Sequence, residues 1–389
     1  MQFKKLFPIL IFFVGMVFSG YQCSSTELTS AKLYIQQKNY DKAIDALQKE
    51  VQKNPKSDEG YYLLGVVLGE KERYAEMIDA YSKSLSISNK FSENIGSSKK
   101  YFWANLFNKG VGYYQRGSKT ADQDSVKLLY GKSIEAFNSA IVIEPDSADT
   151  YKNLAFVYMS AQDYDNAISP LEKLIEKEGA VDGYKFLSEI FYVKGIEYRN
   201  KYDNNKALPD SLETMKYFNK AISVAEEGRE KYPDDSEILL TLSNAYIAAN
   251  KVEVAIDAFK AGVEKDPANQ YYRYNYGVLL LGKNDFGDAE EQFKKALEID
   301  PDYYNASYNL AVTYVKWGAY INKVADEKGD LNNKEYKEKY QKALPHLEKI
   351  VTNKKDDVQM WELLGKVYSV LGMQVDAAKA FEKADELRK

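Results

Sequence analysis

The chain of 389 residues carries a formal net charge of −5 at pH 7 and has a pI near 5.4. An acidic chain whose basic pairs, such as Lys99-Lys100, are offset by nearby acids is a poor candidate for binding nucleic acid. Because the chain has a single Cys, an internal disulfide is excluded. The single His forms no recognisable Ser/His or Cys/His arrangement for nucleophilic catalysis.

Residues 1–22 have the pattern of an export signal. Lys4 and Lys5 precede an almost wholly apolar run from Leu6 to Phe18, which small residues follow. The run is short for a bilayer span, and a charged start before a short apolar centre is typical of a secretory signal peptide. The sequence therefore predicts export, and an uncleaved membrane anchor is the alternative.

Cys23 directly follows this segment. The stretch Ser19-Gly20-Tyr21-Gln22-Cys23 resembles the box that precedes the acylated cysteine of bacterial lipoproteins, although Tyr21 and Gln22 are larger than usual. The resemblance implies lipidation of Cys23, with residues 23–27 as the lipidated cysteine and a short tether. Ser24 in place of Asp favours the outer membrane, facing the periplasm. A soluble periplasmic or secreted protein, cut near Gly20, is the alternative.

From residue 28 onward the chain repeats itself with a period of 34 residues. The period is clearest in four sets of equivalent positions: Ser243/Gly277/Ala311, Ala255/Ala289, Phe259/Phe293 and Pro267/Pro301. Apolar residues recur at three- and four-residue spacings, which indicates helices. A fixed period of this length predicts a helix-turn-helix unit that buries its apolar face by stacking on copies of itself.

One unit displays the pattern in full, and its key residues are Tyr276-Gly277, Leu280, Phe286, Ala289, Phe293, Ala296 and Pro301. This unit resembles the tetratricopeptide repeat. The resemblance implies an all-α fold, a right-handed superhelical solenoid of about nine repeats that runs continuously from residue 28 to residue 389. Weaker copies of the pattern on both sides support that count.

Each position of the unit has a physical cause. The small side chains of Gly277 and Ala289 let two helix backbones approach closely, and Phe293 fills the gap beside them. Pro301 lacks an amide hydrogen and restricts the preceding residue, so it ends the second helix of the unit.

Three insertions are expected near residues 116–128, 199–212 and 321–338. All three fall at the turn between the two helices of a unit, so they should project from one edge. Segments such as Asp203-Asn204-Asn205 and Lys328-Gly329-Asp330 are polar and turn-forming. Two interpretations remain open, a second contact surface and solvated extensions.

The sequence offers no metal or cofactor motif. Acidic pairs such as Asp234-Asp235 fall at helix starts or on polar faces, where carboxylates suit the helix dipole. EF-hand spacing, zinc-ligand spacing and a Gly-rich phosphate loop are missing. His346, after Pro345, is interpreted as structural. We therefore expect no catalytic site, no cofactor and no small-molecule substrate.

The family resemblance implies that a protein or peptide partner binds along the concave face, which the first helices line. Asn153, Asn275 and Asn309 occupy equivalent positions there, and Asn244 lies nearby. A carboxamide can donate to a peptide carbonyl and accept from a peptide amide. The basic clamp that some tetratricopeptide proteins use for acidic peptide ends is excluded, because Leu240 stands where a lysine is needed.

Aromatic residues extend this candidate face. They combine apolar area with polar tips and are enriched at binding hot spots. The competing interpretation for these aromatic residues is packing within or between repeats. For the asparagines, the competing interpretation is simple contact with water. The aromatic candidates are Tyr62, Phe156, Tyr271, Tyr274 and Tyr308.

The sequence thus favours a non-catalytic cell-envelope scaffold that binds a protein or peptide partner and is attached to the membrane through Cys23. The alternative is an accessory lipoprotein subunit of an outer-membrane protein assembly or secretion machine. A third possibility, a glycan-binding envelope protein, draws on the many aromatic residues but lacks an acid pair in a recognisable cleft.

Overall fold

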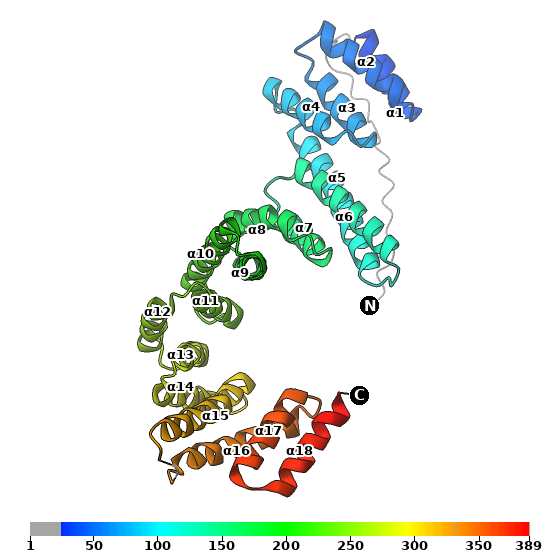
Figure 1. The fold of residues 1–389 in the computed structure, drawn as a ribbon. Coiled ribbons are helices and arrows are strands. Elements are labelled where there is room, and N and C mark those ends of the chain that lie inside the picture. The colour runs from blue at the N-terminus through cyan, green and yellow to red at the C-terminus, as the bar shows by residue number, and fades with distance from the viewer. Residues whose placement is uncertain (1–24, 331, 389) are drawn as a thin grey trace. The chain divides into compact units, whose positions relative to one another are not determined.

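The computed structural model describes residues 25–330 and 332–388, and within these ranges the chain forms eighteen α-helices and no strand (Figure 1). In chain order the helices make nine consecutive helix-turn-helix units, so the predicted all-helical repeat fold is confirmed. Within the described residues no helix is long and apolar enough to cross a membrane. The expected signal peptide and Cys23 lie outside the described residues.

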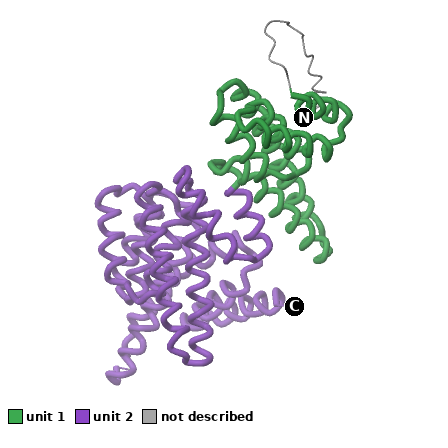
Figure 2. The backbone as a smooth tube through the Cα atoms, turned by 90° about the horizontal axis from the view of Figure 1, so that it is seen from above, with its two compact units in different colours: residues 1–150 green, residues 151–389 purple. Residues whose placement is uncertain are grey.

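The contacts divide the chain into two compact units, residues 1–150 and 151–389 (Figure 2). The boundary falls inside α7, Ala148–Ser160. Each unit is described by itself, and the expectation of one continuous array stays a prediction.

The first unit has its own core, to which residues from Leu28 to Ile143 contribute. Its helices before α7 are α1 (Thr26–Gln36), α2 (Tyr40–Lys53), α3 (Asp58–Glu70), α4 (Tyr74–Ile87), α5 (Ser92–Gly117) and α6 (Gln123–Ile143).

The second unit contains the region with the clearest repeat pattern, and its last repeats share a core that extends from Tyr274 to Ala380. Its helices after α7 are α8 (Tyr164–Glu178), α9 (Val181–Asn205), α10 (Leu208–Lys231), α11 (Ser236–Ala248), α12 (Val252–Lys265), α13 (Gln270–Gly282), α14 (Phe286–Ile299), α15 (Tyr304–Glu327), α16 (Glu335–Asn353), α17 (Val358–Leu371) and α18 (Gln374–Leu387).

Small residues on first helices do allow close packing, as predicted. A Cβ atom built on Gly277 would lie 2.8 Å from the ring of Phe293, and one built on Gly65 would lie 2.4 Å from the ring of Tyr81. Both partners are fully buried. At these two positions, glycine makes room for the aromatic ring of the second helix.

The prolines also end second helices as predicted. α14 ends at Ile299, two residues before Pro301, and α12 ends at Lys265, two residues before Pro267. Where the closing proline is missing, after α8, Gly179 takes a left-handed conformation with φ of 60°. That conformation ends the helix in another way.

The turn inside a unit follows one backbone pattern, which the sequence did not reveal. A residue just after the first helix has positive φ, and the next amide donates to a carbonyl five residues back, as in Asp285 N to Leu280 O at 2.9 Å. This is the Schellman ending of a helix. The positive-φ residues at these turns are Lys38, Glu72, Gln162, Asn250, Asn284 and Gly372.

The three insertions differ from the expected polar loops, because most inserted residues lengthen both helices of their unit. α5 and α6 contain 26 and 21 residues, whereas α3 and α4 contain 13 and 14. The turn signal Lys328-Gly329-Asp330 is correctly placed, since Gly329 has positive φ, whereas Asp203-Asn204-Asn205 belongs to α9 and the turn begins only at Lys206. Close packing continues along the added turns, where Gly117 lies against Tyr130, and this explains why they remain helical.

The first helix begins earlier than the predicted tether allows. Thr26 and Glu27, which were expected in the tether, belong to α1. The Ser25 hydroxyl caps this helix by accepting from Leu28 N at 3.0 Å, and it also donates to the buried carboxylate of Glu50. Ser25 therefore links the start of α1 to α2.

Candidate functional site

Five tyrosines of two successive first helices form the best candidate site, in the second unit. Tyr271 and Tyr274 lie three residues apart on α13, so they share one helix face. Tyr304 and Tyr308 lie four apart on α15, and Tyr303 is the residue directly before that helix. We call these five residues the tyrosine cluster.

Ring contacts join the two helices. The Tyr274 and Tyr303 ring centroids are 5.1 Å apart, and Tyr271 meets Tyr303 edge to face at 5.8 Å. Tyr304 and Tyr308 are 6.3 Å apart. Aromatic pairs at these separations contribute packing energy beyond the area they bury. Tyr271, Tyr274 and Tyr303 thus form an aromatic group across two repeats, and Tyr304 and Tyr308 form a second pair on α15.

Two asparagines predicted to bind a partner adjoin the cluster, but their environments differ. Asn309 is half-buried, and its Nδ2 donates to the Tyr274 hydroxyl at 3.1 Å and to Asn305 O at 3.2 Å. Asn275 is only 1% exposed, and its Nδ2 donates to Tyr271 O within its own helix. Its Oδ1 has no hydrogen-bond partner.

The expected exposed asparagine ladder is therefore corrected at Asn275, because this carboxamide lies inside the packed repeats. Tyr274 is corrected in the same way: it is 7% exposed, with its ring between Phe293 and Tyr303. Tyr271, Tyr308 and Asn309 remain half-buried and accessible at the surface.

The electrostatics of the cluster follow from burial. Burial raises the pKa of Tyr303, and neighbouring tyrosines and Asp300 act in the same direction. Burial also raises the pKa of Tyr304, and the nearby Asp357 adds to the effect. The Lys354 ammonium lies 3.7 Å from the centre of the Tyr304 ring. Tyr303 and Tyr304 therefore present neutral phenols at physiological pH, and the Tyr304 ring already holds one cation on its face.

The remaining candidates do not join this cluster. Asn244 lies half-buried on α11. Phe156, on α7, packs edge to face on Phe186 at 5.4 Å, and Asn153 lies on the same helix. Tyr62 belongs to the first unit and stacks on Phe91 at 4.6 Å. For Tyr62 and Phe156 the packing interpretation describes what the structure shows.

Sequence reasoning missed Tyr303, Tyr304 and Lys354. The 34-residue register aligns the first two with Asn269 and Gln270, so residue type gave no signal at these positions. Lys354 comes from the turn after α16 and reaches Tyr304 only through the stacking of repeats. The dense run Tyr303-Tyr304-Asn305, directly before a predicted first helix, was the available clue.

His346 lies away from the tyrosine cluster and packs within a repeat junction. Its ring is 6.2 Å from that of Tyr314, nearly parallel. Burial lowers its pKa, and Lys294 and Lys349 add to the effect. Within the described ranges no group of three metal-ligating side chains occurs.

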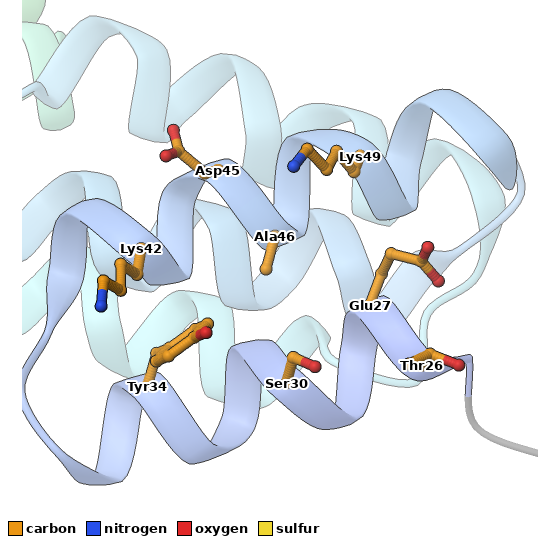
Figure 3. A pocket seen from close by; sticks show the side chains of 8 residues that line it. All are labelled: Thr26, Glu27, Ser30, Tyr34, Lys42, Asp45, Ala46 and Lys49. Atoms are coloured by element: carbon orange, nitrogen blue, oxygen red, sulfur yellow. The ribbon is translucent and has the colours of Figure 1, made fainter.

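A shallow pocket between α1 and α2 is lined by side chains of both signs (Figure 3). Its charged lining residues are Glu27, Asp45, Lys42 and Lys49, and the Lys42 ammonium lies 5.8 Å from the Tyr34 ring centre. Because the charges balance and Glu27 is also paired with Lys53, this pocket has no preference for a charged ligand.

Both units therefore consist of helix-turn-helix repeats, and the second carries an aromatic surface over two first helices. Residues 28–90, 218–270, 240–304 and 274–316 match the tetratricopeptide repeat family, so the chain contains tetratricopeptide repeats in these segments. The last two matched segments together include all five residues of the tyrosine cluster.

Several known proteins are similar to the chain. A TPR repeat-containing protein of Methanocaldococcus jannaschii is 20% identical over 92% of this chain and 68% of its own length. The peroxisomal targeting signal receptor of Candida albicans is 23% identical over 48% of this chain and 30% of its own length. The solved C-terminal part of a TPR repeat-containing protein from Cytophaga hutchinsonii is 15% identical, covers 72% of this chain and 95% of that chain, and has a TM-score of 0.42.

Proposed function

We propose that this protein is a non-catalytic scaffold of the cell envelope that binds a protein or peptide segment over α13 and α15. The observation that carries the proposal is the tyrosine cluster, whose rings and hydroxyls continue from one repeat to the next. Rigid aromatic side chains provide large contact area at a small cost in conformational entropy, which suits a recognition surface.

The accessible polar groups fit a peptide backbone. Both Asn309 Nδ2 bonds are made within the protein, to Tyr274 and Asn305, so its Oδ1 is available to accept from a peptide amide. Tyr271 and Tyr308 flank it with apolar ring area. A segment lying across the two helices would exchange water for aromatic contacts and retain its backbone hydrogen bonds.

One relative supports peptide recognition. The Candida albicans receptor is named for a peroxisomal targeting signal, and its similarity to this chain supports binding of a segment of another protein. It does not indicate which segment this chain binds.

The envelope location rests on the sequence of residues 1–23. A charged start, an apolar run and Cys23 support export followed by lipidation. Several acyl chains on one cysteine would anchor the protein firmly. Cys23→Ser should therefore leave the protein folded and shift it from the membrane fraction to the soluble fraction. Unchanged membrane partitioning would contradict lipid anchoring.

Affinity purification tests the binding proposal directly. Tagged full-length protein is purified from gently cross-linked native envelopes beside a Tyr271→Ala/Tyr308→Ala/Asn309→Ala variant, and partners are identified by mass spectrometry. Tyr320→Ala is the matched control, because this ring is 55% exposed on α15 but lies outside the cluster. We expect a partner that is retained by the control and lost by the triple variant. Equal recovery in all three preparations would disprove binding at the cluster.

A further inference from the structure

A groove in the first unit is a second candidate site. It lies where the end of α3 and the start of α4 meet α5. Its floor is apolar: Phe102 and Leu106 are buried, and Gly69 contributes no side chain. A Cβ atom on Gly69 would lie 2.5 Å from the Phe102 ring, so the glycine is what allows this ring to lie there.

Two tyrosines form walls above that floor. The Tyr74 ring centroid is 6.2 Å from that of Phe102. Tyr101 meets Phe102 edge to face at 5.3 Å. Its side chain is 60% exposed, so most of it remains open to solvent. The groove thus has a fixed aromatic floor and one aromatic wall open to solvent, an arrangement that can accept an apolar side chain.

Two carboxamides line the same groove. Asn105 and Asn108 lie three residues apart on α5, both exposed, and no other side chain of the described part of the chain bonds to them. Asn108 stands two residues before Gly110, as Asn275 stands two residues before Gly277. Here, in contrast to Asn275, the carboxamide reaches solvent and can both donate to and accept from a peptide.

The groove also carries uncompensated negative charge. Glu72 pairs with Lys109 at 3.5 Å, whereas Glu70 is exposed and makes no ion pair within the described residues. Burial raises the pKa of Tyr74, and the carboxylates of Glu72 and Glu70 raise it further, which places both acids close to the aromatic wall. A cation of a ligand would meet a carboxylate and a ring face together.

We infer that this groove is a separate peptide-binding site, selective for an extended segment that carries an apolar side chain followed closely by Lys or Arg. The apolar side chain lies on Phe102 and Leu106, Asn105 and Asn108 hold the backbone, and the basic side chain pairs with Glu70. The site is independent of the tyrosine cluster, because all its residues belong to the first unit.

The test uses fluorescein-labelled peptides of a Gly-Ser background with one Leu and, one to three residues later, one Arg. The matched peptides carry Glu in place of Arg. Affinities for the chain from residue 23 onward are measured by fluorescence anisotropy at low and high salt. We expect the Arg peptides to bind more tightly than the Glu peptides, and added salt to reduce the difference.

Variants locate the binding. Glu70→Gln should weaken the Arg peptides by about threefold to fivefold, the range of an exposed ion pair. Glu70→Lys should reverse the preference toward the Glu peptides. Tyr101→Ala should weaken both sets by about tenfold. Glu93→Gln, an exposed glutamate on α5 outside the groove, is the control and should change nothing.

Three outcomes would overturn the inference: no measurable binding, equal binding of the Arg and Glu peptides, or binding that resists the groove variants and is lost with Tyr308→Ala. The last result would assign the peptides to the tyrosine cluster and leave the proposed function intact. Circular dichroism melting of each variant checks that its fold is retained.

Discussion

The hydroxyl of Tyr314, on α15, donates a 2.8 Å hydrogen bond to Glu290 Oε1, on the preceding helix α14, and so joins two repeats. The same relationship recurs between Tyr246 and Glu226 and between Tyr368 and Glu348, each at 2.7 Å. Because a hydrogen bond to a charged acceptor is stronger than a neutral one, these tyrosines stabilise repeat junctions as well as fill them.

This relationship predicts an alkaline limit to stability. Burial and the hydrogen bond to Glu290 raise the pKa of Tyr314 above its usual value of about 10. The folded chain therefore holds this proton more tightly than the unfolded chain does. The stabilisation is complete below about pH 10 and is lost as the pH rises above it.

Tyr246→Phe/Tyr314→Phe/Tyr368→Phe should reduce the free energy of unfolding at neutral pH by about 1 kcal/mol per site. Above about pH 10 the variant should lose stability less steeply than the natural chain. Urea unfolding across that pH range measures both effects. Parallel curves for the two proteins would show that these junctions do not control the alkaline transition.

The close approach of helices predicts a large penalty at Gly277. A Cβ atom there would lie 2.8 Å from the Phe293 ring, which is fully buried and has little room to move. Gly277→Ala should cost about 1–3 kcal/mol through overpacking. Gly96→Ala, at an exposed helical position with open space, should instead stabilise by up to about 1 kcal/mol. Thermal melting compares the two, and equal melting temperatures would contradict the packing argument.

The turn geometry predicts opposite changes in stability for two substitutions at equivalent turns. Gly372 has a φ of 80° and open space around it, so Gly372→Ala tests backbone strain alone and should cost about 1 kcal/mol. Glu72 has a φ of 59° at the equivalent turn. Glu72→Gly relieves the strain, but it adds unfolded-state freedom, so we expect a smaller gain, below about 1 kcal/mol. Denaturant unfolding measures the stability of both variants. Stabilisation by Gly372→Ala would contradict the explanation from backbone strain.

The unpaired, buried acceptor of Asn275 predicts that this position tolerates an apolar substitution. Since Oδ1 is unpaired and buried, Asn275→Leu should leave stability unchanged or raise it by up to about 1 kcal/mol. Asn275→Asp would bury a charge and should cost more than about 2 kcal/mol. Partner capture should survive Asn275→Leu, because a ligand cannot reach the residue. Loss of capture with an unchanged melting temperature would mean that the repeat opens on binding.

Much of the fold could be predicted because every repeat obeys the same local constraints. The 34-residue spacing of Gly277, Phe293 and Pro301 equivalents indicated the helix pairs, and the turn residues near Lys206 and Gly329 marked the turns of the inserted segments. The lengthened helices were missed because Asp203-Asn204-Asn205 looked like a loop. It forms the last turn of α9 instead.

The candidate site was less predictable, since register alone does not reveal burial. Asn275 and Asn309 occupy equivalent positions, yet one lies inside the packed repeats and the other at their surface. Side chains from neighbouring repeats decide the difference, and a single unit does not contain that information. Lys354 over Tyr304 belongs to the same class of contact, because it joins residues 50 positions apart.

The hydrogen bond between Ser25 and Glu50 has a consequence for the orientation of the first helix pair at a membrane. Only Ser24 separates Cys23 from the capped start of α1, so two extended residues span at most about 7 Å. With an acyl group on Cys23, the first helix pair would rest against the lipid headgroups. This helix pair would then be oriented as well as retained at the bilayer surface.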